Sequence, residues 1–113
     1  MFQDWKTHNA DVKAAFAQMG KKHPKMIAAI GALEQAIAAE ALDAKTRELI
    51  AIAVAVVNHC TSCIAIHAEA AAKAGATESE IAGALATAVY MNAGAAYAYS
   101  LQALEAGGAF GIE

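Results

Sequence analysis

The sequence is short of charged residues, of proline and of aromatic side chains. Only 17% of its 113 residues are charged, and 8 Lys plus Arg against 11 Asp plus Glu give a net charge of −3. A chain without a basic surplus has no electrostatic footprint for nucleic acid or for an anionic membrane surface. Proline interrupts helices and alanine favours them, and this chain has one proline and many alanines. We therefore predict an all-α fold and no nucleic-acid partner.

We expect neither a targeting segment nor a membrane-spanning segment. Residues 1–5 have neither the basic start nor the apolar core of a signal peptide. The apolar run at residues 49–57 is much shorter than the roughly 20 residues that a membrane-spanning helix needs. We expect a cytoplasmic protein with no membrane partner.

The low charge is accompanied by a large apolar content. Hydrophobic residues make up 58% of the sequence, and the mean hydropathy is +0.37. A chain of this length forms one domain, and a small domain leaves much of its surface exposed. Apolar side chains in excess of what one small core can bury favour association between copies. We expect a single domain over residues 1–113 that forms a homo-oligomer.

Helical periodicity and capping signals divide the chain into about five to six helices. The expected helices span residues 4–19, 24–40, 44–57, 61–74 and 81–104. Asp43 is placed to cap the third helix, and residues 77–80 form a capping box ahead of the fifth. Gly75 is expected to end the fourth helix in a left-handed conformation. The fifth helix is either continuous or broken near residues 92–94, and residues 107–111 are expected to form a flexible tail.

The residues with reactive side chains gather in one stretch, directly after the apolar run. Cys60 and Cys63 form a C-x-x-C, and His67 follows the second cysteine by four residues. If a helix begins near Thr61, Cys63 lies in its first turn, where the positive end of the helix dipole favours a thiolate. His67 then lies one turn further along the same face. This spacing indicates redox or metal chemistry rather than a secreted disulfide framework.

The same residues also allow less reactive interpretations. Cysteines are often simply buried, and the cysteine pair with His67 and His59 would supply the four ligands of a zinc site. Glu48 would serve as a solvated partner of Lys45, three residues earlier. The alternative to an enzyme is therefore a non-catalytic module, either a thiol–disulfide adaptor or a metal-binding oligomer. For the enzyme we predict no metal and no cofactor.

Glu48 lies twelve residues before Cys60, which gives the pattern E-x11-C-x-x-C-x3-H. Set between K-T-R-E-L-I-A (residues 45–51) and K-A-G-A-T-E-S-E-I (residues 73–81), this pattern resembles the alkylhydroperoxidase D-like (AhpD-like) group of the carboxymuconolactone decarboxylase superfamily. The resemblance is strongest over residues 45–94. It implies an AhpD-like helical bundle, a homotrimer or homohexamer, and an antioxidant peroxidase that reduces hydroperoxides at the expense of a dithiol or protein reductant.

Carried over residue by residue, the resemblance makes Cys63 the peroxidatic cysteine, which a hydroperoxide oxidises to a sulfenic acid, and Cys60 the resolving cysteine. Glu48 and His67 correspond to the family's proton relay. Ser62 departs from the alkylhydroperoxidase D pattern, in which a histidine precedes the second cysteine. The decarboxylase branch of the superfamily typically lacks the cysteine pair. We therefore predict a thiol-dependent peroxidase, and decarboxylation is the less favoured alternative.

Overall fold

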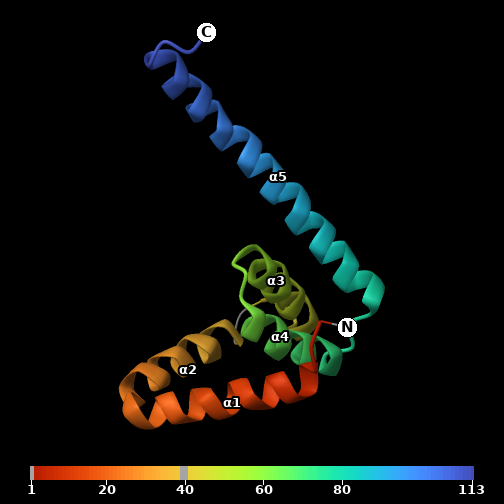
Figure 1. Ribbon diagram of the computed structural model, residues 1–113. Coiled ribbons are helices and arrows are strands. Elements are labelled where there is room, and N and C mark those ends of the chain that lie inside the picture. Colours follow the sequence, from red (N-terminus) through yellow and green to blue (C-terminus); the bar gives the residue numbers. More distant parts are fainter. Residues whose placement is uncertain (1, 39–40) are drawn as a thin grey trace.

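The computed structural model describes residues 2–38 and 41–113, which form five α-helices and no strand (Figure 1). The helices are α1 (Trp5–Lys22), α2 (Pro24–Ala38), α3 (Ala44–Val57), α4 (Thr61–Lys73) and α5 (Glu78–Ala109). The predicted all-α class is therefore confirmed. The expected end of the second helix at residue 40 lies outside the described residues.

The helix starts follow the capping signals of the sequence. The Asp43 carboxylate accepts a hydrogen bond from the Thr46 N–H at 2.8 Å and begins α3, and Asp4 accepts one from the Thr7 N–H at the start of α1. These backbone donors lower the pKa of both aspartates below the usual value, because they stabilise the ionised carboxylate. The predicted capping box, built from Thr77 and Glu80, is formed at the start of α5.

The first helix ends later than predicted. It continues past residue 19 to Lys22, and the N–H of the capping residue His23 donates to the Met19 carbonyl at 2.8 Å. A residue that precedes proline is disfavoured in the helical conformation, and His23 precedes Pro24. The proline therefore sets the end of α1.

The last helix is also longer than predicted. α5 is continuous through residues 92–94 and reaches Ala109, so the expected flexible tail at residues 107–111 is wrong. Gly111, in the left-handed conformation with φ 84°, terminates the helix. Beyond it the Ile112 N–H donates to the Gly107 carbonyl at 3.0 Å, and the Ile112 side chain lies close to Gly107. These contacts fold the chain end back onto the last turn.

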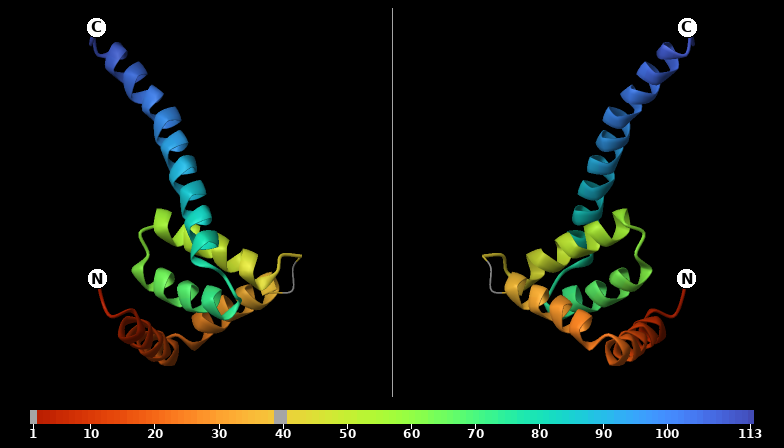
Figure 2. Two further views of the ribbon diagram at one scale, coloured as in Figure 1. Left: turned by 90° about the vertical axis from the view of Figure 1, so that its right-hand side faces the viewer. Right: turned by 90° about the vertical axis from the view of Figure 1, so that its left-hand side faces the viewer.

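α3 is the central helix of the fold. It packs against α4 and against the first part of α5, while α1 packs against α4 and α2 (Figures 1 and 2). The buried apolar core is small and consists of Ile52 and Ala55 on α3 with Ala65 and Ala71 on α4. Alanine at these positions lets the two helices approach closely. The α3–α4 pair therefore forms the interior of the chain.

Polar contacts attach α1 to α4. The amide of Asn9, a residue only 7% exposed, donates to Glu69 Oε2 at 2.9 Å, and Lys13 Nζ donates to Glu69 Oε1 at 2.6 Å. The hydrogen bond from Lys13 lowers the pKa of Glu69. These bonds fix the start of the α1–α2 hairpin against the helix that carries the cysteines.

The second half of α5 extends away from the other helices (Figures 1 and 2). Residues 81–104 contain no charged side chain, yet Tyr90, Tyr97 and Leu104 are 76%, 73% and 75% exposed. The chain exposes 8672 Å², whereas a compact monomer of this mass exposes about 5,800 Å². Its radius of gyration is 18.6 Å, against about 13 Å for a compact chain of this length. A single copy thus leaves an apolar helix without packing partners.

Within residues 2–38 and 41–113, none of the helices has the length and apolar character that crossing a lipid bilayer requires.

Candidate active site at the start of α4

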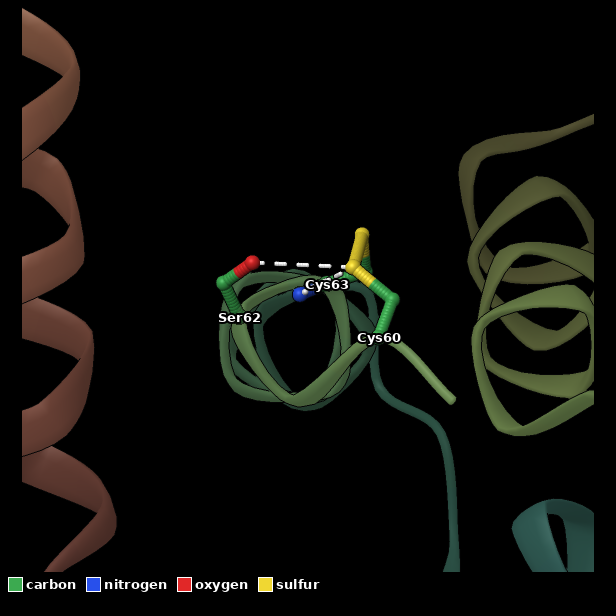
Figure 3. Close-up of a disulfide and its surroundings, with 3 residues drawn as sticks. All are labelled: Cys60, Ser62 and Cys63. Carbon is green, nitrogen blue, oxygen red and sulfur yellow. Dashed lines mark hydrogen bonds between the residues drawn. A yellow bond between two sulfur atoms is a disulfide. The ribbon is translucent and has the colours of Figure 1, made fainter. Parts of the chain in front are cut away.

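The cysteine pair lies at the N-terminus of α4. Cys60 is the N-cap residue and Cys63 lies in the first turn, so the predicted helix start near Thr61 is confirmed. The two sulfur atoms are joined in a disulfide, with the Cα atoms 5.2 Å apart (Figure 3). Both cysteines are half-buried. The unpaired N–H groups and the dipole at this helix end favour a negatively charged sulfur in the reduced state.

A tight turn between α3 and α4 places Cys60. Asn58 caps α3, and His59 adopts the left-handed conformation with φ 56°. The Cys60 N–H then donates to the Ala55 carbonyl at 2.9 Å. The backbone of Cys60 is therefore bonded to the buried end of α3, as expected for residues that close the apolar run.

Two hydrogen-bonding groups surround the sulfur of Cys60. The Cys63 N–H donates to Cys60 Sγ at 3.3 Å, and Ser62 Oγ lies 3.5 Å from the same sulfur (Figure 3). The spacing in the sequence placed Cys63 in the first turn of this helix. It did not predict that Cys60 caps the helix or that the Ser62 hydroxyl lies beside the Cys60 sulfur. The sequence signal was present, because the residue directly before a helix start caps it whenever its side chain carries an acceptor.

A histidine–glutamate pair links α4 to α3. His67 Nδ1 lies 2.7 Å from Glu48 Oε2, and the two side chains are 37% and 20% exposed. Glu48 reaches α4 because α3 packs beside it. A carboxylate bonded to Nδ1 fixes the ring orientation and leaves Nε2 as the nitrogen that can exchange a proton. The structure thus brings Glu48 and His67 together, with His67 one turn along α4 from Cys63.

The less reactive interpretation of Glu48 is not what the structure shows. Lys45 turns away from it and forms a salt bridge with Glu80 at the start of α5, with Nζ 2.9 Å from Oε2. The hydrogen bond between these two side chains raises the pKa of Lys45 and lowers that of Glu80. Lys45 therefore joins α3 to α5, and Glu48 is left to bond His67.

The zinc alternative required His59 to lie beside the two cysteines and His67. In the described part of the chain, no three His, Cys, Asp or Glu side chains are grouped so that they could hold a metal ion. The arrangement that is present suits thiol chemistry. It combines a disulfide at the positive end of α4 with His67 on the same helix, which bonds Glu48 on α3.

These features define a class, namely all-helical proteins that carry a C-x-x-C pair beside a histidine and a glutamate. The family model described as "Carboxymuconolactone decarboxylase family" matches residues 24–106, so the chain belongs to the carboxymuconolactone decarboxylase family. The match extends beyond residues 45–94, on which the resemblance was strongest. The AhpD-like group, identified from the Glu48, Cys60, Cys63 and His67 pattern, lies within this family.

A solved structure agrees with this assignment, and curated proteins are similar to this chain over most of its length. The crystal structure of a carboxymuconolactone decarboxylase family protein from Legionella pneumophila in its apo form is 35% identical, with a TM-score of 0.73, and the match covers 96% of this chain and 97% of that one. An "Uncharacterized protein" from Haemophilus influenzae is 62% identical over 107 residues, which are 94% of this chain and 95% of the relative. "Uncharacterized protein 4 in cox locus" from Paracoccus denitrificans is 40% identical over 92 residues, or 80% and 83% of the two chains.

Proposed function

We propose that this protein is a thiol-dependent peroxidase that reduces hydroperoxides through the Cys60/Cys63 pair. The Cys63 thiolate attacks the O–O bond, which gives a sulfenic acid on Cys63 and releases an alcohol or water. Cys60 then attacks the sulfenic sulfur, and the S–S bond forms as a second water leaves. A dithiol or protein reductant returns both cysteines to thiols. The observation that carries this proposal is a bonded cysteine pair at a helix N-terminus with a histidine–glutamate pair one turn away.

The Glu48–His67 pair supplies the proton transfers that this reaction needs. The Cys63 thiol must lose a proton before it attacks, and the leaving alkoxide must gain one. With Nδ1 held by Glu48 at 2.7 Å, Nε2 of His67 is the nitrogen that accepts the first proton and later returns it. Glu48 orients the ring and stabilises the imidazolium form that exists between the two transfers.

We further infer that the chain works as a homotrimer or homohexamer. Its exposed surface of 8672 Å² exceeds that of a compact monomer by roughly 2,800 Å². A standard protein interface buries about 800 Å² on each partner, so this excess is enough for more than one interface per chain. The second half of α5 and the outward face of α2 provide apolar side chains for such contacts, among them Tyr97, Leu104, Ile30 and Leu33.

The test of the peroxidase proposal is the rate at which peroxide consumes the two thiols. Pre-reduced protein is mixed with hydrogen peroxide or an alkyl hydroperoxide in a stopped-flow instrument, and dithiothreitol is added afterwards. Oxidation that is much faster than that of free cysteine, complete at one peroxide per pair and reversed by dithiothreitol supports the enzyme. Oxidation at the rate of a free thiol would favour the thiol–disulfide adaptor instead. Repeating the assay with several electron donors then identifies the class of reductant.

A further inference from the structure

The two cysteines of the pair have different surroundings. Cys60 Sγ accepts the Cys63 N–H at 3.3 Å and lies 3.5 Å from the Ser62 hydroxyl, whereas no hydrogen bond to Cys63 Sγ is formed within the described residues (Figure 3). Ser62 is half-buried, so its hydroxyl is partly shielded from water. Hydrogen bonds to a charged acceptor are stronger than those to a neutral one. The donors around Cys60 therefore stabilise its thiolate more than its thiol.

We propose that Ser62 is a positioning residue that, together with the Cys63 N–H, holds Cys60 as a thiolate in the reduced pair. The Cys60 thiolate then has two tasks in the proposed peroxidase cycle, on which this part of the inference rests. It is the nucleophile that resolves oxidised Cys63, and it is the sulfur that leaves when the disulfide is reduced. The effect of Ser62 on the Cys60 thiol itself does not depend on a peroxide substrate.

In the resolving step the Cys60 thiolate attacks the sulfur of the Cys63 sulfenic acid. The S–S bond forms and the S–O bond breaks, and the departing hydroxide takes a proton from solvent, directly or by way of His67, and leaves as water. A thiolate that is already ionised needs no base for this attack. Resolution is therefore fast while the other proton transfers proceed at His67.

In the reducing step a thiolate of the external dithiol attacks Cys63 Sγ. The disulfide breaks, Cys60 leaves with the bonding electron pair, and a mixed disulfide remains on Cys63. The second thiol of the reductant then attacks the mixed disulfide, which releases Cys63 and the oxidised reductant. A thiol with a low pKa is the better leaving group in thiol–disulfide exchange, so the donors on Cys60 direct the incoming thiolate to Cys63.

Other charged or titratable groups near the pair come from each packed element. α3 contributes Glu48 and α4 contributes His67, which bond each other. His59 precedes Cys60 in the turn, and α1 places Lys6 in the cavity that Ile64 lines. None of these groups is altered by a substitution at Ser62. A comparison of Ser62 variants therefore isolates the hydroxyl.

The pKa of the Cys60 thiol is measured in a Cys63→Ser background, which leaves one cysteine and keeps the backbone N–H at position 63. The rate of alkylation by iodoacetamide as a function of pH reports the thiolate fraction. We expect a pKa well below the usual value of about 8.5. At pH values below the pKa in both proteins, adding Ser62→Ala should reduce the thiolate fraction by roughly tenfold, the effect of one lost hydrogen bond to a charged group. Ser62→Thr, which keeps a hydroxyl, should restore it.

Thr61→Ala is the matched control, because Thr61 lies in the same turn but is exposed and its hydroxyl bonds no group in the described residues. It should change the thiolate fraction by less than threefold. In the protein with both cysteines, Ser62→Ala should shift the equilibrium with glutathione tenfold toward the disulfide. The reduction potential of the Cys60/Cys63 pair should then be about 30 mV more negative than in the wild type. The proposal would be overturned if the Cys60 pKa in the Cys63→Ser background were the same with Ser62, with Ser62→Ala and with Ser62→Thr, provided that the helicity of the three proteins is unchanged. Slow peroxide oxidation of the wild type would refute the peroxidase and leave this inference standing.

Discussion

The α3–α4 pair and the second half of α5 are built from similar residues but are packed very differently. Both are rich in alanine and in apolar residues, although α3 and α4 also carry charged side chains, among them Lys45, Glu48 and Glu69. On α3 and α4 the side chains of Ile52, Ala55 and Ala71 are at most 4% exposed, and the cysteine pair and the Glu48–His67 hydrogen bond are formed within one chain. On α5 the side chains beyond residue 88 are exposed almost without exception. All four residues of the proposed chemistry therefore come from α3 and α4 of one chain and the turn between them, whereas the second half of α5 is left unpacked in that chain.

A pocket of about 440 Å³ lies at the boundary between these regions, where the contact between α5 and α3 ends. Its lining is almost entirely apolar and comes from both helices: Ala53, Val54, Val57, Ala84, Thr87, Ala88, Met91, Asn92 and Ala95. On one side of it α5 is attached to α3, and on the other it has no partner in the described chain. If copies associate as we infer, mutations in the two regions should have separable effects, on turnover in one and on assembly in the other.

The largest effect is expected at the cysteines. Cys63→Ser should abolish peroxide turnover and leave no sulfenic acid that dimedone can trap, because the attacking sulfur is gone. Cys60→Ser should still form a trappable sulfenic acid on Cys63, since only the resolving step is lost. Mass spectrometry of the labelled proteins distinguishes the two, and light scattering should show both with the size of the wild type. Dimedone labelling of Cys60 in the Cys63→Ser protein would reverse the assigned roles.

The next largest effect is expected at the histidine–glutamate pair. Glu48→Gln and His67→Asn should each lower the turnover rate near neutral pH by roughly 10²–10⁴-fold, the usual contribution of a general base. The double variant should be little worse than either single one, because groups that act in one relay do not contribute additively. If the turnover rate of Glu48→Gln recovers at higher pH, the loss of rate at neutral pH is due to slower deprotonation of the Cys63 thiol. A wild-type rate at neutral pH would leave activation to His67 and the helix end.

A charge on α5 should affect assembly and not chemistry. Leu104, 75% exposed in the single chain, is replaced by glutamate, and Gln102→Glu introduces the same charge two residues away at a polar position. An unpaired carboxylate buried between copies costs several kcal/mol, so Leu104→Glu should raise the dissociation constant by about 100-fold or more. Light scattering over a dilution series measures this. Peroxide turnover per chain should persist wherever circular dichroism shows intact helices. A wild-type oligomer in Leu104→Glu would remove residue 104 from the interface.

The sequence contained enough local information to predict the helices and the attachment of the cysteines to one of them. Capping by Asp43, the capping box at residues 77–80 and the left-handed Gly75 are local signals, and each is present in the structure. The length of α5 was underestimated because glycines weigh against a helix, although single glycines in an alanine-rich helix cost only about 1 kcal/mol each. Local signals therefore predict where helices begin better than where they end.

The site was only partly predictable because its second half depends on tertiary packing. Cys63 and His67 share a helix, so their spacing alone placed them on one face. Glu48 lies on a different helix, and the sequence allowed it to bond either Lys45 on its own helix or a group on α4. The choice depends on the packing of α3 against α4, and on Glu80 being placed to bond Lys45 instead. Such pairings between helices carry no periodic signal.

The smallest effect is expected at the salt bridge that attaches the start of α5 to α3. The hydrogen bond from Lys45 lowers the pKa of Glu80 below its usual 4.5, so the charge of Glu80 stabilises the fold above that pH. This stabilisation is lost as the pH falls through the lowered pKa of Glu80, and the contribution of Lys45 is lost as the pH rises through its own raised pKa. Glu80→Gln keeps the capping box, which accepts glutamine, but removes the charge.

At pH 7 Glu80→Gln should lower the thermal midpoint by about 1–4 °C, as expected for an exposed ion pair. As the pH falls through the lowered pKa of Glu80, the difference between the variant and the wild type should shrink toward zero, because Glu80 becomes protonated in the folded as well as in the unfolded state. Glu78→Gln is the control, since it removes the same charge from the same helical turn but has no salt bridge in the described residues. A difference for Glu80→Gln that did not shrink as the pH was lowered would mean that the side chain contributes by packing or capping. The attachment of α5 to α3 would then rest on apolar contacts, and the contrast between the two halves of α5 would depend on burial alone.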